Sequence, residues 1–273
     1  MKRLFALVTL VVVVAAPQSV AAAPDHSTTY YLSLGDSLAE SFQPNGDLTN
    51  GYAEQLHAAL VIDNPKLELV KLGCGGESTA SMRFGSQLPT VVISCGTPRN
   101  YDALFPKGTQ LAEAVSFLRA HKGKVRLVTI DIGANDIQRF DADFNLIICV
   151  FEDAGCEAQL AALSRNLAAI LAELRAAAGP GVPIVGMTYY NAFAPAFDPE
   201  ADAHVSEFNG ALTSTYGAAS VPVADVAGAF HNGQPDSVEF ICAWTWVCTL
   251  GDLHANTVGY GVIADEFLKT ALP

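Results

Sequence analysis

Five short apolar, β-branched segments alternate with longer helical stretches along this chain, and the alternation limits it to one class of fold. The clearest segment, Val125–Ile132, is apolar at almost every position, as in a strand covered on both faces. Strands that alternate with helices form βαβ units with a mostly parallel sheet. We therefore expect an α/β fold: a flavodoxin-like, three-layer α/β/α sandwich with about five parallel strands. The predicted strands are Thr28–Leu34, Leu67–Leu72, Val125–Ile132, Val182–Thr188 and Val221–Val226.

The intervening segments have the composition and the end signals of helices. Gly123 and Gly179-Pro180 stand where two of them should stop. In sheets of this kind, ligands bind beyond the carboxyl ends of the strands, so the loops that follow the strands are where chemistry is expected. The predicted helices are Gly51–Val61, Thr109–His121, Cys156–Ala178, Asp202–Tyr216 and Thr257–Leu272.

The N-terminus is typical of a signal peptide. Lys2 and Arg3 precede an apolar run over Leu4–Ala16, and small residues at 21–23 offer a cleavage site. The run has 13 residues, fewer than the roughly 20 that span a bilayer. A retained membrane anchor is the alternative. We expect a signal peptide over residues 1–22, a single mature domain over 23–273, secretion, and no stable membrane insertion.

The charge of the chain excludes one class of partner. The net charge is −13 and becomes −15 once Lys2 and Arg3 are removed, and no basic patch is present. Such a surface repels phosphate backbones, so we expect no nucleic-acid partner. We also expect a monomer.

Six cysteines follow the cleavage site: Cys74, Cys95, Cys149, Cys156, Cys242 and Cys248. An even number in an exported chain indicates disulfides. Fifteen pairings are possible, and closeness in sequence favours 74–95, 149–156 and 242–248. The alternative is a metal site, but neither C-x-x-C nor H-E-x-x-H occurs. We expect neither a metal nor an organic cofactor.

Two motifs follow predicted strands directly. Gly35-Asp36-Ser37-Leu38 comes after the first strand, where a serine at a strand-to-helix turn can present its hydroxyl above the sheet. Gly133-Ala134-Asn135-Asp136 comes after the third strand and can aim an amide into the same crevice. Each motif alone is also ordinary turn or cap chemistry. We interpret Asp36 and Asp136 as structural residues that hold these turns.

Two further segments complete the set. Gly73–Ser78 follows the second strand, and its glycines allow close approach of the backbone to a substrate or serve only a turn. Gly251-Asp252-Leu253-His254 precedes the last helix. A histidine in a loop with a carboxylate close by can act as an oriented base. We interpret the other five histidines as surface or packing residues.

Together these four motifs resemble the blocks of the SGNH/GDSL hydrolase superfamily, in order and on matching elements, over about Tyr30 to Phe267. The cysteines are similar to those of its secreted actinobacterial-type esterases and lipases. The resemblance implies the SGNH hydrolase fold and the catalytic residues Ser37 and His254. It also implies an oxyanion hole formed by the Ser37 and Gly76 backbone N–H groups and the Asn135 amide.

Two positions depart from the family pattern. Lys71 stands where an asparagine is common, and Gly251 stands where the family usually has the carboxylate, three residues before the histidine. Either Asp252 orients His254 or a backbone carbonyl near Gly251 does so, and we favour Asp252. Only a carboxylate stabilises the imidazolium with a full charge.

The expected activity is that of a carboxylic ester hydrolase, a GDSL esterase or lipase. It would cleave short- to medium-chain acyl esters or lipids through an acyl-enzyme. Carbohydrate deacetylase, phospholipase and acyltransferase activities are alternatives on the same fold, as is a non-catalytic surface-binding role. The segment Trp244–Trp246, inside the expected 242–248 loop, either lines a substrate pocket or packs.

Overall fold

The protein contains a five-stranded, all-parallel sheet in the order β2-β1-β3-β6-β7. The structure is a computed structural model that describes residues 27–85, 101, 103–140, 146–148, 156–193 and 201–272. All five predicted strands are present, and the α/β prediction is confirmed. The strands are β1 (Thr29–Gly35), β2 (Leu67–Lys71), β3 (Val125–Asp131), β6 (Ile184–Met187) and β7 (Val223–Ala224).

The last strand is shorter than its sequence pattern predicts. Only Gly186 with Val223 and Met187 with Ala224 are paired between β6 and β7. The ladder stops there because Asp225 caps a short helix, α9 (Val226–Ala229), by accepting a hydrogen bond from the Gly228 N–H. A helix cap thus takes over residues that the apolar pattern assigned to a strand.

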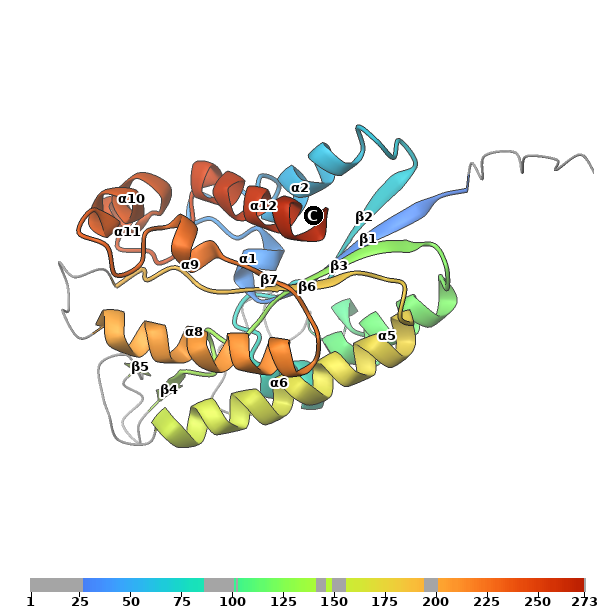
Figure 1. The fold of residues 1–273 in the computed structure, drawn as a ribbon, viewed down its shortest axis with the longest axis horizontal. Coiled ribbons are helices and arrows are strands. Elements are labelled where there is room, and N and C mark those ends of the chain that lie inside the picture. The colour runs from blue at the N-terminus through green and yellow to red at the C-terminus, as the bar shows by residue number, and fades with distance from the viewer. Residues whose placement is uncertain are drawn as a thin grey trace, which may run out of the picture.

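Helices cover both faces of the sheet (Figure 1). On one face α12 packs against α2 and against β6 and β7, and on the other α5 contacts β1 while α8 contacts β6. None of the helices in the described part of the chain is long and apolar enough to cross a bilayer. The long helices lie within two residues of their predicted ends: α2 (Tyr52–Leu60), α5 (Gln110–Ala120), α6 (Cys156–Ala178), α8 (Ala201–Ala218) and α12 (Thr257–Ala271).

Several short elements were not predicted. One- and two-turn helices and three-residue strands are too short to show a periodicity in the sequence. They are α1 (Ser37–Glu40), α3 (Thr79–Phe84), α10 (Ser237–Trp244), α11 (Val247–Leu250) and the antiparallel pair β4 (Gln138–Phe140) and β5 (Leu146–Ile148).

The topology creates a crevice between the ends of β1 and β3. The chain leaves β1 to form β2 on one side of it and then returns to form β3 on the other side. At such a switch point the connections diverge to opposite faces of the sheet, which leaves room for a ligand. Gly35 and Asp131, the last residues of the two strands, are register partners. The motifs that contain Ser37 and Asn135 therefore emerge beside each other.

Candidate active site

Ser37 lies at the N-terminus of α1, directly beyond the end of β1. Gly35 makes the turn with a φ of +138°, and a Cβ there would lie 1.9 Å from the Asp131 carbonyl oxygen. No other residue fits that position. Asp36 then caps α1, because its Oδ1 accepts a hydrogen bond of 2.9 Å from the Leu38 N–H. The serine hydroxyl is thereby presented at the carboxyl edge of the sheet.

His254 reaches Ser37 from the far end of the sequence. Its Nε2 lies 2.8 Å from Ser37 Oγ, and its side chain is 25% exposed. Phe42, just beyond α1, packs against the imidazole with the ring centres 4.6 Å apart. The base is thus held at hydrogen-bonding distance from the hydroxyl and retains access to solvent.

Asp252 lies on the other side of the imidazole. Its Oδ1 is 2.7 Å from His254 Nδ1 and also accepts a 2.9 Å hydrogen bond from the His254 backbone N–H. One oxygen therefore closes a local turn and contacts the ring, which explains how a carboxylate only two residues away reaches it. With Nδ1–H donated to Asp252, Nε2 is left to accept the Ser37 proton.

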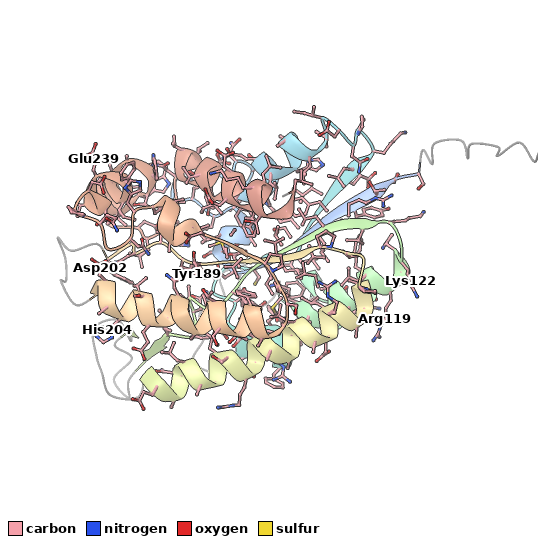
Figure 2. The ribbon with its side chains drawn as sticks, in the orientation of Figure 1. Arg119, Lys122, Tyr189, Asp202, His204 and Glu239 are labelled. Atoms are coloured by element: carbon pink, nitrogen blue, oxygen red, sulfur yellow. A yellow bond between two sulfur atoms is a disulfide. The ribbon has the colours of Figure 1, made fainter. Side chains whose placement is uncertain are left out.

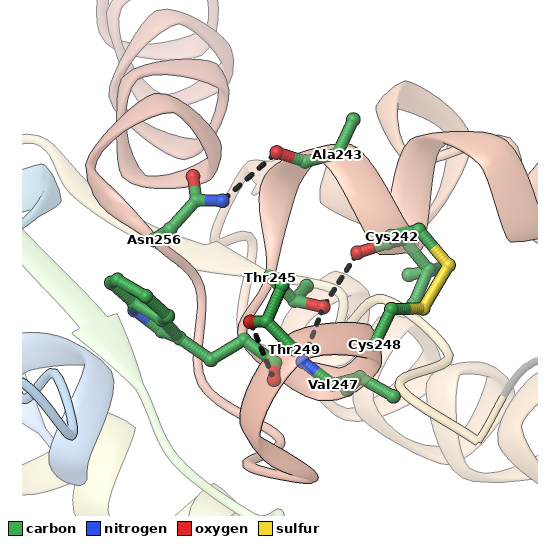
Figure 3. The surroundings of a disulfide bond; sticks show 9 residues. Cys242, Ala243, Thr245, Val247, Cys248, Thr249 and Asn256 are labelled. Carbon is green, nitrogen blue, oxygen red and sulfur yellow. Dashed lines mark hydrogen bonds between the residues drawn. A yellow bond between two sulfur atoms is a disulfide. The ribbon is translucent and has the colours of Figure 1, made fainter.

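A disulfide-closed loop supports the His254 segment. Cys242 in α10 and Cys248 in α11 form a disulfide, and Thr245 between them pairs with Ala255. The Trp246 N–H donates to the His254 carbonyl at 3.0 Å. Asn256 adds a side-chain hydrogen bond to the Ala243 carbonyl (Figure 3). Trp244 packs against Phe230 and Phe240, and Trp246 donates to Gln43. The segment Trp244–Trp246 is not among the cavity-lining residues described below.

The remaining cysteine predictions fall mostly outside the described residues. Cys74 is buried and disulfide-bonded, and its expected partner Cys95 lies outside the described part of the chain. Cys149 also lies outside it, as does the side chain of Cys156. Their pairing stays a prediction.

Asn135 and Gly76 reach the same cavity as Ser37. The Asn135 side-chain amide donates one hydrogen bond, 2.9 Å long, to the Glu77 carbonyl, which fixes its orientation. Gly76 adopts a φ of +79°, which favours glycine. Gly73, the other glycine weighed for this role, instead packs behind α1, where a Cβ would lie 2.4 Å from the Ala39 carbonyl carbon.

Asp136 ties these two segments together. Its carboxylate accepts hydrogen bonds from the backbone N–H of Thr79, at 2.8 Å, and from the Thr79 hydroxyl. The turn that contains Asn135 is thereby joined to the segment that contains Gly76. The structural interpretation of Asp136 agrees with these contacts.

We expect Asn135→Ala to lower kcat for ester hydrolysis by about 10²–10³, because one preorganised donor to a developing oxyanion is worth that much. The measurement is kcat on a p-nitrophenyl ester. Asn45→Ala, in an exposed loop, is the matched control. An unchanged kcat for Asn135→Ala would remove this residue from the oxyanion hole.

Glu77 belongs to a buried polar network behind these turns. The sequence did not reveal this network. Glu77 is fully buried and accepts hydrogen bonds from Ser81, Tyr101 and Gln110. Gln110 in turn accepts from the Gly35 N–H at 2.7 Å and donates to the Gly35 carbonyl at 2.9 Å. The network links the Gly76 segment to the end of β1. Burial raises the pKa of Glu77 to about 7.

This pKa makes stability depend on pH. Protonated Glu77 stabilises the fold fully below its unfolded pKa of 4.5, and the contribution is lost as pH rises to about 7. At about 1.4 kcal/mol per pH unit, the loss is roughly 3 kcal/mol. We therefore expect Glu77→Gln to reduce the fall in unfolding free energy between pH 4.5 and pH 8 by that amount, as measured by urea denaturation. Glu68→Gln, on the exposed side of β2, should leave the fall unchanged.

The cavity above Ser37 has a volume of about 460 Å³ and a mainly apolar wall. One part of the wall comes from α8 and another from the segment after β6. Tyr189 in that segment lies between the helical layers, whereas Arg119, Lys122 and Glu239 lie at the outside of the molecule (Figure 2). The apolar and aromatic lining residues are Leu38, Phe42, Ala134, Ile137, Tyr189, Tyr190, Ala192, Phe193, Val205, Phe208 and Leu253.

Comparison with known proteins gives one family. The model of the GDSL-like lipase/acylhydrolase family matches residues 33–262, a span that contains all four motifs. No curated protein matches the sequence.

Solved structures share the fold at low sequence identity. An acetylxylan esterase from Geobacillus stearothermophilus is 17% identical with a TM-score of 0.55, over 90% of this chain and 95% of that one. A phospholipase A1 from Streptomyces albidoflavus is 16% identical with a TM-score of 0.53, over 89% of this chain and 100% of that one. An α/β hydrolase from the metagenome of Lake Arreo is 19% identical with a TM-score of 0.51, over 90% and 95% of the two chains.

Proposed function

This chain belongs to the GDSL-like lipase/acylhydrolase family, whose members are carboxylic ester hydrolases, and we propose that Ser37 is its catalytic nucleophile. The observation that supports the proposal is the hydrogen-bonded series from Ser37 Oγ to His254 Nε2, at 2.8 Å, and from His254 Nδ1 to Asp252, at 2.7 Å. A nucleophile, a base and an orienting carboxylate in this order are the parts of a serine hydrolase.

The chemistry follows from these positions. His254 accepts the Ser37 proton as Oγ attacks the ester carbonyl, and Asp252 stabilises the imidazolium that forms. The Ser37 and Gly76 N–H groups and the second amide hydrogen of Asn135 hold the oxyanion. His254 then protonates the leaving alcohol, which leaves an acyl-enzyme. The histidine next activates a water molecule, whose attack on the acyl carbonyl releases the acid and restores Ser37.

The cavity favours an acyl group longer than acetyl. Its volume of about 460 Å³ lies within the range of pockets that hold small-molecule ligands and exceeds what an acetyl group needs. The apolar wall of the cavity includes Val205, Phe208 and Phe193, and burial of methylene groups against it is favourable. We propose medium-chain acyl esters, including lipid esters, as the substrate class.

The site of action is proposed to be outside the cell. The N-terminal residues 1–22 have the features of a signal peptide, and the Cys242–Cys248 disulfide is compatible with an oxidising compartment. Sequencing the N-terminus of protein recovered from the medium should give Ala23 as the first residue. Recovery of the uncut chain in the membrane fraction would favour an anchor.

The experiment that tests the activity is hydrolysis of p-nitrophenyl esters from C2 to C16. We expect a maximum between about C6 and C10, because the cavity is larger than an acetyl group needs and its wall is mainly apolar. We also expect covalent labelling of Ser37 by a fluorophosphonate, mapped by mass spectrometry. Turnover should survive dialysis against EDTA. Failure to hydrolyse any of these esters, sugar acetates or phospholipids would overturn the proposed function.

A larger side chain in the apolar wall of the cavity should change how kcat/KM depends on the length of the acyl chain. We expect Val205→Phe, at a buried position that lines the cavity, to lower kcat/KM for the C8 ester about tenfold and to spare the C2 ester. The C8-to-C2 ratio of kcat/KM is the measurement. Val258→Phe, exposed on α12, is the control with an unchanged ratio. An unchanged ratio for Val205→Phe would place the acyl chain elsewhere.

A further inference from the structure

Two carboxyl groups lie buried behind Ser37, and the ester mechanism uses neither. Asp36 is 1% exposed and Asp131 is 0% exposed. They lie side by side at the ends of two neighbouring strands. Gly35 and Asp131 are register partners, and the Asp36 N–H donates to the Asp131 carbonyl at 3.0 Å. The two carboxyl groups lie beside each other, because they accept hydrogen bonds from consecutive backbone N–H groups, those of Leu38 and Ala39. Two ionised carboxylates have acceptors only and repel each other, so their burial side by side favours a proton on one of them.

Both carboxyl groups also bind the first turn of α1. Asp36 accepts from the Leu38 N–H at 2.9 Å, and Asp131 accepts from the Ala39 N–H at 3.2 Å. Two consecutive amides of the helix that begins at Ser37 are therefore held by the two neighbouring carboxyl groups. A shift of either carboxyl group would move this turn and, with it, the Ser37 hydroxyl and N–H.

The surroundings supply no permanent positive charge. Within the described residues, no lysine or arginine forms an ion pair with either carboxyl group. Tyr189 donates to Asp36 at 2.8 Å, and Tyr52 donates to Asp131 at 2.6 Å. Further tyrosines face the pair from β1, α8, α12 and the segment after β6. The other ionisable groups that act on the pair are Glu40, Glu77, Asp136 and His254.

We propose that Asp36 and Asp131 share one proton, and that this pair positions Ser37 by holding the first turn of α1. The effect on catalysis rests on the proposed function of Ser37, whereas the shared proton does not. Each residue of the pair is a positioning residue, because neither contacts the reacting ester atoms.

The proton belongs on Asp131. Burial, together with the charge of Asp36, raises the pKa of Asp131 well above its usual range. Burial raises the pKa of Asp36 as well, but its hydrogen bonds from Leu38 and Tyr189 and the field of His254 oppose that rise, so Asp36 keeps the negative charge. A second charge would oppose the oxyanion in the same cavity.

Infrared spectroscopy tests the shared proton without reference to activity. We expect the C=O stretching band of a protonated carboxylic acid at pH 8 in a protein with Glu77→Gln, a change that removes the buried carboxyl group whose pKa, about 7, lies nearest to that pH. Adding Asp131→Asn should abolish the band. Absence of the band from the Glu77→Gln protein, or its persistence after Asp131→Asn, would overturn the proposal.

Kinetics test the positioning. Asparagine can still donate to Asp36 and accept from Tyr52 or Ala39, so Asp131→Asn should keep kcat within about threefold of wild type. Asp131→Ala should lower kcat about 10²-fold at similar KM, since displacing a reacting group by about 1 Å has that effect. A fall in kcat in both variants, or in neither, contradicts the positioning role. If Asp131→Ala does not fold, the kcat of Asp131→Asn and the infrared band still test the proposal. A wild-type protein that shows the band but hydrolyses no ester would overturn only the proposed function.

Discussion

Ser37→Ala is expected to lower kcat for p-nitrophenyl ester hydrolysis at least about 10⁴-fold. Alanine removes the only atom that can form the acyl-enzyme and leaves the backbone N–H in place. Substrate binding should therefore persist, so KM should change little where it reflects binding. The residual rate should equal that supported by the oxyanion donors and substrate binding alone.

Two further measurements make the Ser37 result specific. Ser214→Ala changes an exposed serine of α8 and should retain wild-type kcat. Circular dichroism and thermal unfolding should show that Ser37→Ala stays folded. A folded Ser37→Ala protein with kcat near wild type would show that another group attacks the ester.

Asp252→Asn is expected to lower kcat by about 10³–10⁴, because an asparagine in this position favours the wrong histidine tautomer and supplies no charge to the imidazolium. The 2.7 Å contact between Asp252 Oδ1 and His254 Nδ1 carries this prediction. The pH dependence of kcat/KM, measured beside kcat, reports the titration of the base.

The control for Asp252 is Asp265→Asn, at an exposed position of α12, which should leave kcat unchanged. Near-normal turnover by Asp252→Asn would assign the orienting role to a backbone carbonyl near Gly251. The two arrangements considered from the sequence thus give opposite kinetic results.

The fold could be predicted from the sequence because its strands are covered on both faces. A run such as Val125–Ile132 is rich in apolar and β-branched residues because helices bury both of its faces, and a run of that kind is easy to recognise. By contrast, α10 and α11 total 12 residues around a disulfide and have no periodicity that separates them from a loop. The two-residue β7 was overestimated, because the capping role of Asp225 is decided by contacts with Thr188 and Gly228.

The candidate site could be predicted in part. The motifs around Ser37, Asn135 and His254 follow strands or precede a helix, so their meeting at one edge of the sheet follows from topology. Asp131 and Gln110 gave no such signal. A carboxylate at the end of a strand resembles a solvated turn residue, and Gln110 resembles any residue in the first turn of a helix. The sequence did not identify the part of the cavity wall that α8 contributes, because Val205 and Phe208 have the apolar side chains of core residues.

The distance in sequence between nucleophile and base determines when the protein can become active. Ser37 and His254 are 217 residues apart, and α12, which follows the histidine, packs on α2 near the start of the chain. Tyr260 in α12 donates to the Phe42 carbonyl at 2.7 Å, just beyond the nucleophile helix. A chain synthesised from its N-terminus therefore exposes Ser37 long before a base exists to activate it. If Ser37 and His254 act as proposed, hydrolysis requires that α12 has docked on α2, so activity reports that these distant parts of the chain have come together.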